Sequence, residues 1–242
     1  MTTKTNNWKP LDFQCPYACD YCPEKDHSPT PKLREGWKEI PRDRTGIWVS
    51  SDTDLFHPAV PDELIEKILA HSKRLYHCYI FCTKNPERYL DFLGQFPAWT
   101  FFVTTVESDI DYETSKAPSP LERLKWMKVL KKTLEESPGL APVDYEINLD
   151  LQPIMDFSAD FLPQLLELAP HQIGIGRMIG DCEFPEPSFR RTLHLVREMS
   201  KCIVVGMPIS RSCWVNIDGE RDTIDEPLTD WPPRRKLEDI EL

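Results

Sequence analysis

The chain alternates along most of its length between short apolar runs and amphipathic stretches. Apolar or strictly alternating runs favour strands, and apolar residues that recur every three or four positions favour helices. We predict strands at 8–13, 46–50, 77–82, 99–106, 143–151, 172–176 and 202–206, and helices at 33–37, 61–75, 86–93, 119–134, 158–169 and 187–200. Regular alternation of strands and helices is typical of a parallel sheet covered by helices.

The number of units favours an incomplete barrel. Six strand–helix units followed by one more strand fill about 200 residues, whereas a complete eight-unit barrel needs roughly 250. We therefore predict an α/β fold, a partial (β/α)6 TIM-like barrel with parallel strands, over residues 1–207. Residues 208–242 are rich in Asp and Glu, and we expect a short irregular C-terminal extension that packs on or near the barrel.

Two of the helices carry clear signals at their first residues. Pro61 is followed by Asp62 and Glu63, and a helix tolerates Pro and favours carboxylates in its first turn. Ser119-Pro-Leu-Glu122 fits a capping box. The apolar positions that follow it repeat at helical spacing: Leu124, Met127, Leu130 and Leu134.

Three thiols follow the first predicted strand. Cys15, Cys19 and Cys22 have the spacing C-x3-C-x2-C, and thiolates select iron–sulfur clusters, zinc or Cu(I). A four-iron cluster usually takes four Cys, so three would leave one iron open for chemistry, with Tyr21 as an apolar wall. A zinc site completed by His27, and three thiols without any metal, both remain open.

The Cys segment resembles the signature of the radical S-adenosylmethionine (SAM) superfamily, C-x3-C-x-aromatic-C. The resemblance implies a partial barrel in which Cys15, Cys19 and Cys22 hold a [4Fe-4S] cluster that binds SAM. It implies reductive cleavage of SAM to a 5′-deoxyadenosyl radical, which abstracts hydrogen from a substrate, with a flavodoxin- or ferredoxin-like electron donor. Two further segments are similar to short phage- and mobile-element-associated radical SAM proteins of unestablished substrate, and more distantly to spore photoproduct lyases: 50–58 and 81–88.

Polar residues follow the predicted strands, where the functional groups of barrels gather. Ser50, Ser51 and Asp52 occupy the place at which the superfamily binds the amine of SAM, although the common Gly-Gly-Glu is absent. Lys84 or Arg177 is predicted to bind the SAM carboxylate, which Arg would do with two hydrogen bonds.

Glu107 or Asn148 is predicted to accept hydrogen bonds from the ribose of SAM. Asn148 and Asp150 also fit a simpler interpretation, in which they face solvent along a strand. Cys82 ends the third strand and is a candidate hydrogen-donating catalytic thiol.

The remaining polar residues have simpler interpretations. Asp54 is predicted to cap a turn before Pro58, with His57 as a loop residue rather than a proton shuttle. We expect two other thiols to pack as small hydrophobes in strands, Cys78 and Cys202, and two to remain unligated in loops, Cys182 and Cys213.

Charge and composition narrow the function classes. The net charge of −11 disfavours a broad surface for nucleic acid, which needs clustered Lys and Arg. No apolar run reaches the ~18 residues of a membrane span, and the polar start and clustered Cys favour a cytoplasmic protein. Three hypotheses remain: a radical SAM enzyme of unknown substrate, a non-enzymatic zinc-binding (Cys3His) adaptor, and a barrel that binds a cluster but acts only as a partner protein.

Overall fold

The computed structural model describes residues 6–22, 27–41, 46–176 and 184–206. Its centre is a seven-stranded sheet in the order β1-β4-β5-β6-β7-β8-β9, and every neighbouring pair is parallel. The strands are β1 Asn6–Trp8, β4 Ile47–Val49, β5 Cys78–Thr83, β6 Trp99–Thr105, β7 Asp144–Leu151, β8 Gln172–Ile175 and β9 Val204–Gly206. Within the described residues β1 and β9 end the sheet without pairing to each other, which confirms the predicted α/β partial barrel.

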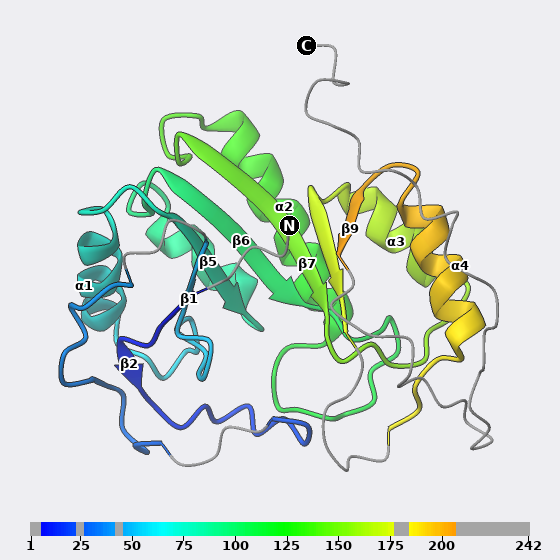
Figure 1. The fold of residues 1–242 in the computed structure, drawn as a ribbon, viewed down its shortest axis with the longest axis horizontal. Coiled ribbons are helices and arrows are strands. Elements are labelled where there is room, and N and C mark those ends of the chain that lie inside the picture. The colour runs from blue at the N-terminus through cyan, green and yellow to red at the C-terminus, as the bar shows by residue number, and fades with distance from the viewer. Residues whose placement is uncertain (1–5, 23–26, 42–45, 177–183, 207–242) are drawn as a thin grey trace.

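Helices surround the outside of the curved sheet (Figure 1). They are α1 Asp62–Ser72, the 3-10 helix η1 Pro86–Phe92, α2 Pro120–Glu136, α3 Phe161–Leu168 and α4 Phe189–Met199. The predicted start of α2 is confirmed, because the Ser119 hydroxyl accepts a hydrogen bond from the N–H of Glu122 at 3.3 Å. None of the helices in the described residues is long and apolar enough to cross a membrane.

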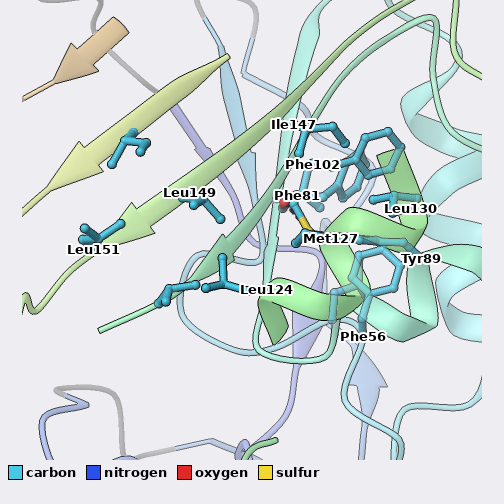
Figure 2. Close-up of a cluster of buried hydrophobic side chains, with 14 of the residues drawn as sticks. Phe56, Phe81, Tyr89, Phe102, Leu124, Met127, Leu130, Ile147, Leu149 and Leu151 are labelled. Carbon is cyan, nitrogen blue, oxygen red and sulfur yellow. Dashed lines mark hydrogen bonds between the residues drawn. The ribbon is translucent and has the colours of Figure 1, made fainter. Parts of the chain in front are cut away.

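The two faces of each strand have different surroundings because successive side chains point to opposite sides. On the outer face of β7, Ile147, Leu149 and Leu151 are buried in the main core. Figure 2 shows them beside Phe81, Phe102 and the α2 residues Leu124, Met127 and Leu130. The inner face of β7 instead carries Asn148 and Asp150, which leaves the inside of the partial barrel for polar groups.

The segment before β4 differs from the prediction. The run 8–13 splits into β1 and the two-residue strand β2, Leu11–Asp12, with Pro10 between them; Pro has no N–H to donate to a ladder. β2 pairs antiparallel with β3, Lys32–Leu33, in a separate small sheet. The predicted helix 33–37 is therefore wrong, because the chain leaves β3 and turns through Gly36, whose φ is +69°.

Three further local predictions are corrected. Helix α3 begins at Phe161 rather than at Ser158, whose hydroxyl instead binds the Asp109 carboxylate and accepts from the N–H of Asp160. The helix predicted at 86–93 is a 3-10 helix. Cys202 does not pack in a strand: it is exposed in the turn after α4, and β9 begins only at Val204.

Residues 208–242 lie outside the described part of the chain. The boundary between the barrel and a C-terminal extension therefore stays a prediction, as do the interpretations of Cys182 and Cys213.

Candidate functional site

A cavity of about 790 Å³ opens at the carboxyl edge of the sheet. Its walls come from the segment 13–22, which we call the Cys loop, and from residues at the ends of β4, β5, β6 and β7. The predicted site residues that line it are Cys15, Cys19, Cys22, Ser50, Ser51, Asp52, Cys82 and Lys84.

The three thiols of the Cys loop are partly buried and line this cavity. Burial raises the pKa of Cys15 to about 12, and the negative charge of Asp54 adds to that rise. Burial also raises the pKa of Cys19. A positively charged group bound among these thiols would offset both effects, as metal ions do for their thiolate ligands.

Residues far along the chain hold the Cys loop in place. The N–H of Asp20 donates to the carbonyl of Thr114 at 2.9 Å, and the N–H of Lys116 donates to the carbonyl of Tyr17 at 2.8 Å. Both contacts come from the loop 106–118 that joins β6 to α2, and Figure 1 shows this loop beside the Cys loop. The thiols therefore lie on a loop that hydrogen bonds hold against the rest of the fold, not on an unrestrained surface loop.

The sequence is compatible with a zinc ion or an iron–sulfur cluster at the Cys loop, and the residues around the three thiols do not fit both equally well. Among the described residues, no group of three or more His, Cys, Asp or Glu is arranged to hold a metal ion. His27 lies with its Nδ1 3.2 Å from Nη2 of Arg34 and 3.5 Å from Oδ1 of Asp12, so this part of the chain holds no ready-made Cys3His zinc site. A four-iron cluster is larger than one ion and its thiolates stand farther apart, so three thiols around a shared cavity fit it better.

The turn after β4 brings three predicted residues to the cavity. Ser50 has a φ of +55°, which only a minority of non-glycine residues adopt, and its buried hydroxyl has no hydrogen-bond partner among the described residues. Asp52 is 5% exposed, and its Oδ2 lies 2.7 Å from Nη2 of Arg34 and 3.5 Å from Nζ of Lys9. Its Oδ1 has no partner within the described residues.

Asp54 anchors the same turn to the end of β5. Its carboxylate accepts from the N–H of Phe56 at 2.9 Å, the hydroxyl of Thr83 at 2.7 Å and the N–H of Lys84 at 2.8 Å. The predicted turn-capping role of Asp54 is confirmed. His57 lies in this turn with its ring 4.4 Å from that of Tyr17, and burial lowers its pKa, helped by the charge of Arg88.

Beside the cavity, four side chains form what we call the Glu107 network: Tyr21, Lys84, Glu107 and Arg123. The Glu107 carboxylate is 3% exposed, accepts from Nη2 of Arg123 at 2.8 Å, and binds the Lys84 ammonium and the Tyr21 hydroxyl. Burial alone would raise the pKa of Glu107, but Lys84 and Arg123 outweigh it and hold that pKa well below its ordinary value.

Three residues predicted to bind SAM or shield the cluster are not brought to the cavity wall. The oxygens of Glu107 are engaged in the network, and Tyr21 is directed into the network by its hydroxyl. Asn148 donates to Glu146 and accepts from the N–H of Gln172, both at 2.9 Å. The predicted ribose contact of Glu107 or Asn148 therefore has no support in this geometry, and Arg177 lies outside the described residues.

Inner-face residues of β5, β6 and β7, with Gln152 just beyond β7, line the cavity and form what we call the strand wall: Cys82, Thr105, Asp150 and Gln152. Sγ of Cys82 lies 3.8 Å from Oγ1 of Thr105, and Thr105 is paired with Asp150 in the sheet register. Burial raises the pKa of Cys82 to about 12 and that of Asp150 to about 7. Cys78 lies at the opposite end of β5, away from this wall.

One interpretation of the sequence has Asp150 facing solvent along its strand, and the structure places it on the cavity instead. The signal was in the sequence: Asp150 has the same parity as Asn148 and stands at the carboxyl end of an alternating strand. In a parallel sheet that end is where functional groups meet.

Comparison with known proteins gives little beyond this geometry. No model of a known protein family matches the chain, and no curated protein does. Among solved structures, the chain is similar to a mutant spore photoproduct lyase with dinucleoside spore photoproduct, at 14% identity and a TM-score of 0.40. The match covers 67% of this chain and 48% of that one, so this chain corresponds to about half of it.

Proposed function

We propose that this chain is a radical SAM enzyme. The observation that carries the proposal is that Cys15, Cys19 and Cys22 line one cavity at the carboxyl edge of an open parallel α/β sheet. Three thiols can hold three irons of a [4Fe-4S] cluster and leave the fourth for SAM, and a bound cluster and SAM would together supply a 5′-deoxyadenosyl radical for hydrogen abstraction.

The residues beside the thiols have the chemistry to bind the methionine end of SAM. Ser50, Ser51 and Asp52 offer hydroxyl and carboxylate oxygens to an ammonium, and the oxygens of Ser50 and Asp52 that no described residue pairs with favour a ligand donor there. Lys84 offers an ammonium to a carboxylate. We assign Glu107 to positioning Lys84 and Arg123 rather than to binding the ribose.

Cys82 stays a candidate catalytic thiol in this proposal. It lies in the strand wall and lines the same cavity as the Cys loop, and burial keeps it in the neutral S–H form from which a hydrogen atom is donated. The proposal also includes a cytoplasmic setting and a flavodoxin- or ferredoxin-like reductant.

The test is anaerobic reconstitution of the full chain with iron and sulfide. We expect a brown protein that cleaves SAM to 5′-deoxyadenosine when reduced by dithionite. Replacing Cys15, Cys19 or Cys22 with Ala should remove most of the bound iron and the cleavage. Cys202→Ala is the matched control, because this exposed thiol is outside the site and its loss should change neither.

Other outcomes separate the alternatives. A colourless protein that retains one tightly bound zinc would support the adaptor hypothesis and contradict the proposal. A protein that binds the cluster but leaves SAM intact under reduction would support the partner-protein hypothesis instead. If the three Cys-loop variants kept as much iron and SAM cleavage as Cys202→Ala, the Cys-loop thiols would not be the ligands of the cluster.

A further inference from the structure

The strand wall contains a carboxylate that no described residue satisfies. Asp150 lines the cavity, yet among the described residues its side chain makes no hydrogen bond and no ion pair. In the same cavity, Asp52 pairs with Arg34 and Asp54 accepts three hydrogen bonds. A partly enclosed carboxylate without a partner costs free energy, which a ligand group can recover.

The Lys84 ammonium does not pair with the Asp150 carboxylate. The ammonium of Lys84 favours ionised Asp150 from a distance, but it is already bound to Glu107 and Tyr21. Burial raises the pKa of Asp150 to about 7 despite Lys84, and the negative charge of Glu107 adds to the rise. Among the described residues, the strand wall therefore has no cation that is free to pair with Asp150.

Two glycines next to the wall leave room for its polar groups. A Cβ on Gly174 would lie 3.0 Å from Oδ1 of Asp150, and one on Gly176 would lie 2.5 Å from Cδ of Gln152. Any larger residue at these positions would displace the carboxylate or the carboxamide. Because Gly174 in β8 and Gly176 just beyond it have no Cβ, both groups can lie over this backbone and remain on the cavity.

The charges around the cavity point in the same direction. Among the described lining residues, Asp20, Asp52, Asp54 and Asp150 carry carboxylates and Lys84 carries the single ammonium, and of the four carboxylates Asp52 is paired with Arg34 and Lys9. Such a wall attracts cations and repels phosphate.

We propose that the strand wall binds the substrate through a positively charged nitrogen group, an amine or a guanidinium, held by Asp150. This inference rests on the proposed radical SAM function, because that function makes the bound molecule a substrate. Thr105 and Gln152 add neutral hydrogen-bonding groups on either side of the carboxylate. The substrate class is thus an amine- or guanidine-bearing molecule, with no phosphate at this wall.

The test uses agmatine, which carries an amine and a guanidinium and no negative charge. The full chain, reconstituted and saturated with SAM, is titrated with agmatine in a calorimeter. Asp150→Asn should weaken binding roughly tenfold or more, as expected for the loss of a charge-assisted pair. Asp91→Asn removes the same charge from the exposed surface of η1 and should leave the affinity unchanged.

The pH dependence gives a second measurement. Agmatine keeps both charges between pH 6 and pH 8, so its affinity should rise as Asp150 ionises around pH 7 and stay flat in Asp150→Asn. The groups that face Asp150 are Lys84, Glu107 and Cys82. The pKa of Glu107 lies well below this range and that of Cys82 is about 12, so neither carboxylate nor thiol changes charge in it.

Three results would overturn the proposal: equal agmatine affinity in the wild type and Asp150→Asn, displacement of agmatine by inorganic phosphate, or agmatine binding that only SAM-free protein shows. The last would assign Asp150 to SAM itself. The binding assay does not depend on SAM cleavage, so a wild type that binds agmatine through Asp150 without cleaving SAM would contradict the proposed function alone.

Discussion

Two acidic side chains lie at the carboxyl ends of neighbouring strands, and their carboxylates have opposite environments. Glu107, just beyond β6, has two cations and a tyrosine hydroxyl around its carboxylate. Asp150, on β7, has no partner within the described chain. The pKa of Glu107 is consequently held well below its ordinary value, and that of Asp150 is raised to about 7.

The difference distinguishes the Glu107 network, which stabilises the wall of the cavity, from Asp150, which is left to bind a ligand. The Glu107 network joins the Cys loop, β5, β6 and α2, so its charges stabilise the architecture. The strand wall leaves its charge for a ligand. Variants of the two regions should therefore differ in sign as well as in size.

The largest effect is expected for Glu107→Gln, which leaves Lys84 and Arg123 without their counter-charge. We expect a loss of about 3–5 kcal/mol in the free energy of unfolding, measured in urea at pH 7. Folding lowers the pKa of Glu107 from its ordinary value of 4.5, so this stabilisation is complete above that pH. The gap between wild type and variant should shrink as the pH falls below it.

The matched control is Glu136→Gln, an exposed partner of Lys132 on α2. Its effect should stay below about 1 kcal/mol, as for surface ion pairs. Equal effects at Glu107 and Glu136 would remove the distinction between a built network and a solvated charge.

A smaller loss is expected for Thr83→Val, which keeps the shape of a fully buried side chain. The variant removes the hydroxyl that donates to Asp54 and accepts from the N–H of Asn85. We expect about 2 kcal/mol of destabilisation in the same urea experiment. Thr133→Val is the comparison, since its hydroxyl only returns to its own helix at Val129. A larger loss at Thr133 than at Thr83 would contradict the anchoring role of Asp54.

Tyr21→Phe should cost about 1 kcal/mol, because Glu107 loses one neutral donor and keeps both cations. A second measurement checks the link to the Cys loop: alkylation of Cys19 and Cys22 in the apo protein, followed by mass spectrometry, should become faster. Unchanged alkylation rates would mean that other contacts alone hold the loop.

The smallest effect is expected for Asp150→Asn, with the opposite sign. Folding raises the pKa of Asp150 from 3.8 to about 7, so ionisation opposes folding from about pH 4 to pH 7 and by a constant amount above that. The variant should gain roughly 0.5–1 kcal/mol at pH 8, allowing for solvent access, and the gain should disappear below pH 4. A variant less stable than the wild type at pH 8 would place a partner on Asp150.

The fold was largely predictable from periodicity. Six of the seven parallel strands and the start of α2 follow from apolar runs and a capping box, whereas β1 shares only Trp8 with the predicted strand 8–13. The pairing of β2 with β3 did not, because two-residue strands carry no period to detect. Cys202 was misplaced because it adjoins the apolar residues of β9 in the sequence, although it lies in the turn after α4.

The site was predictable only where chemistry is local in sequence. The spacing of Cys15, Cys19 and Cys22 identifies them as candidate ligands. Lys84 is identified by its position directly after a predicted strand. The partners of Glu107 could not be predicted, since Tyr21 and Arg123 come from distant segments that only the tertiary structure joins.

The contacts from Thr114 and Lys116 to the Cys loop set an order of assembly. During synthesis the three thiols emerge first, on a flexible segment whose retaining loop and strands β4 to β6 have not yet been made. Parallel pairing is non-local, so the cavity closes only after those later residues fold back. Before that, the thiols are open to any soft metal ion, so the proposed cluster would be inserted only after the barrel has formed.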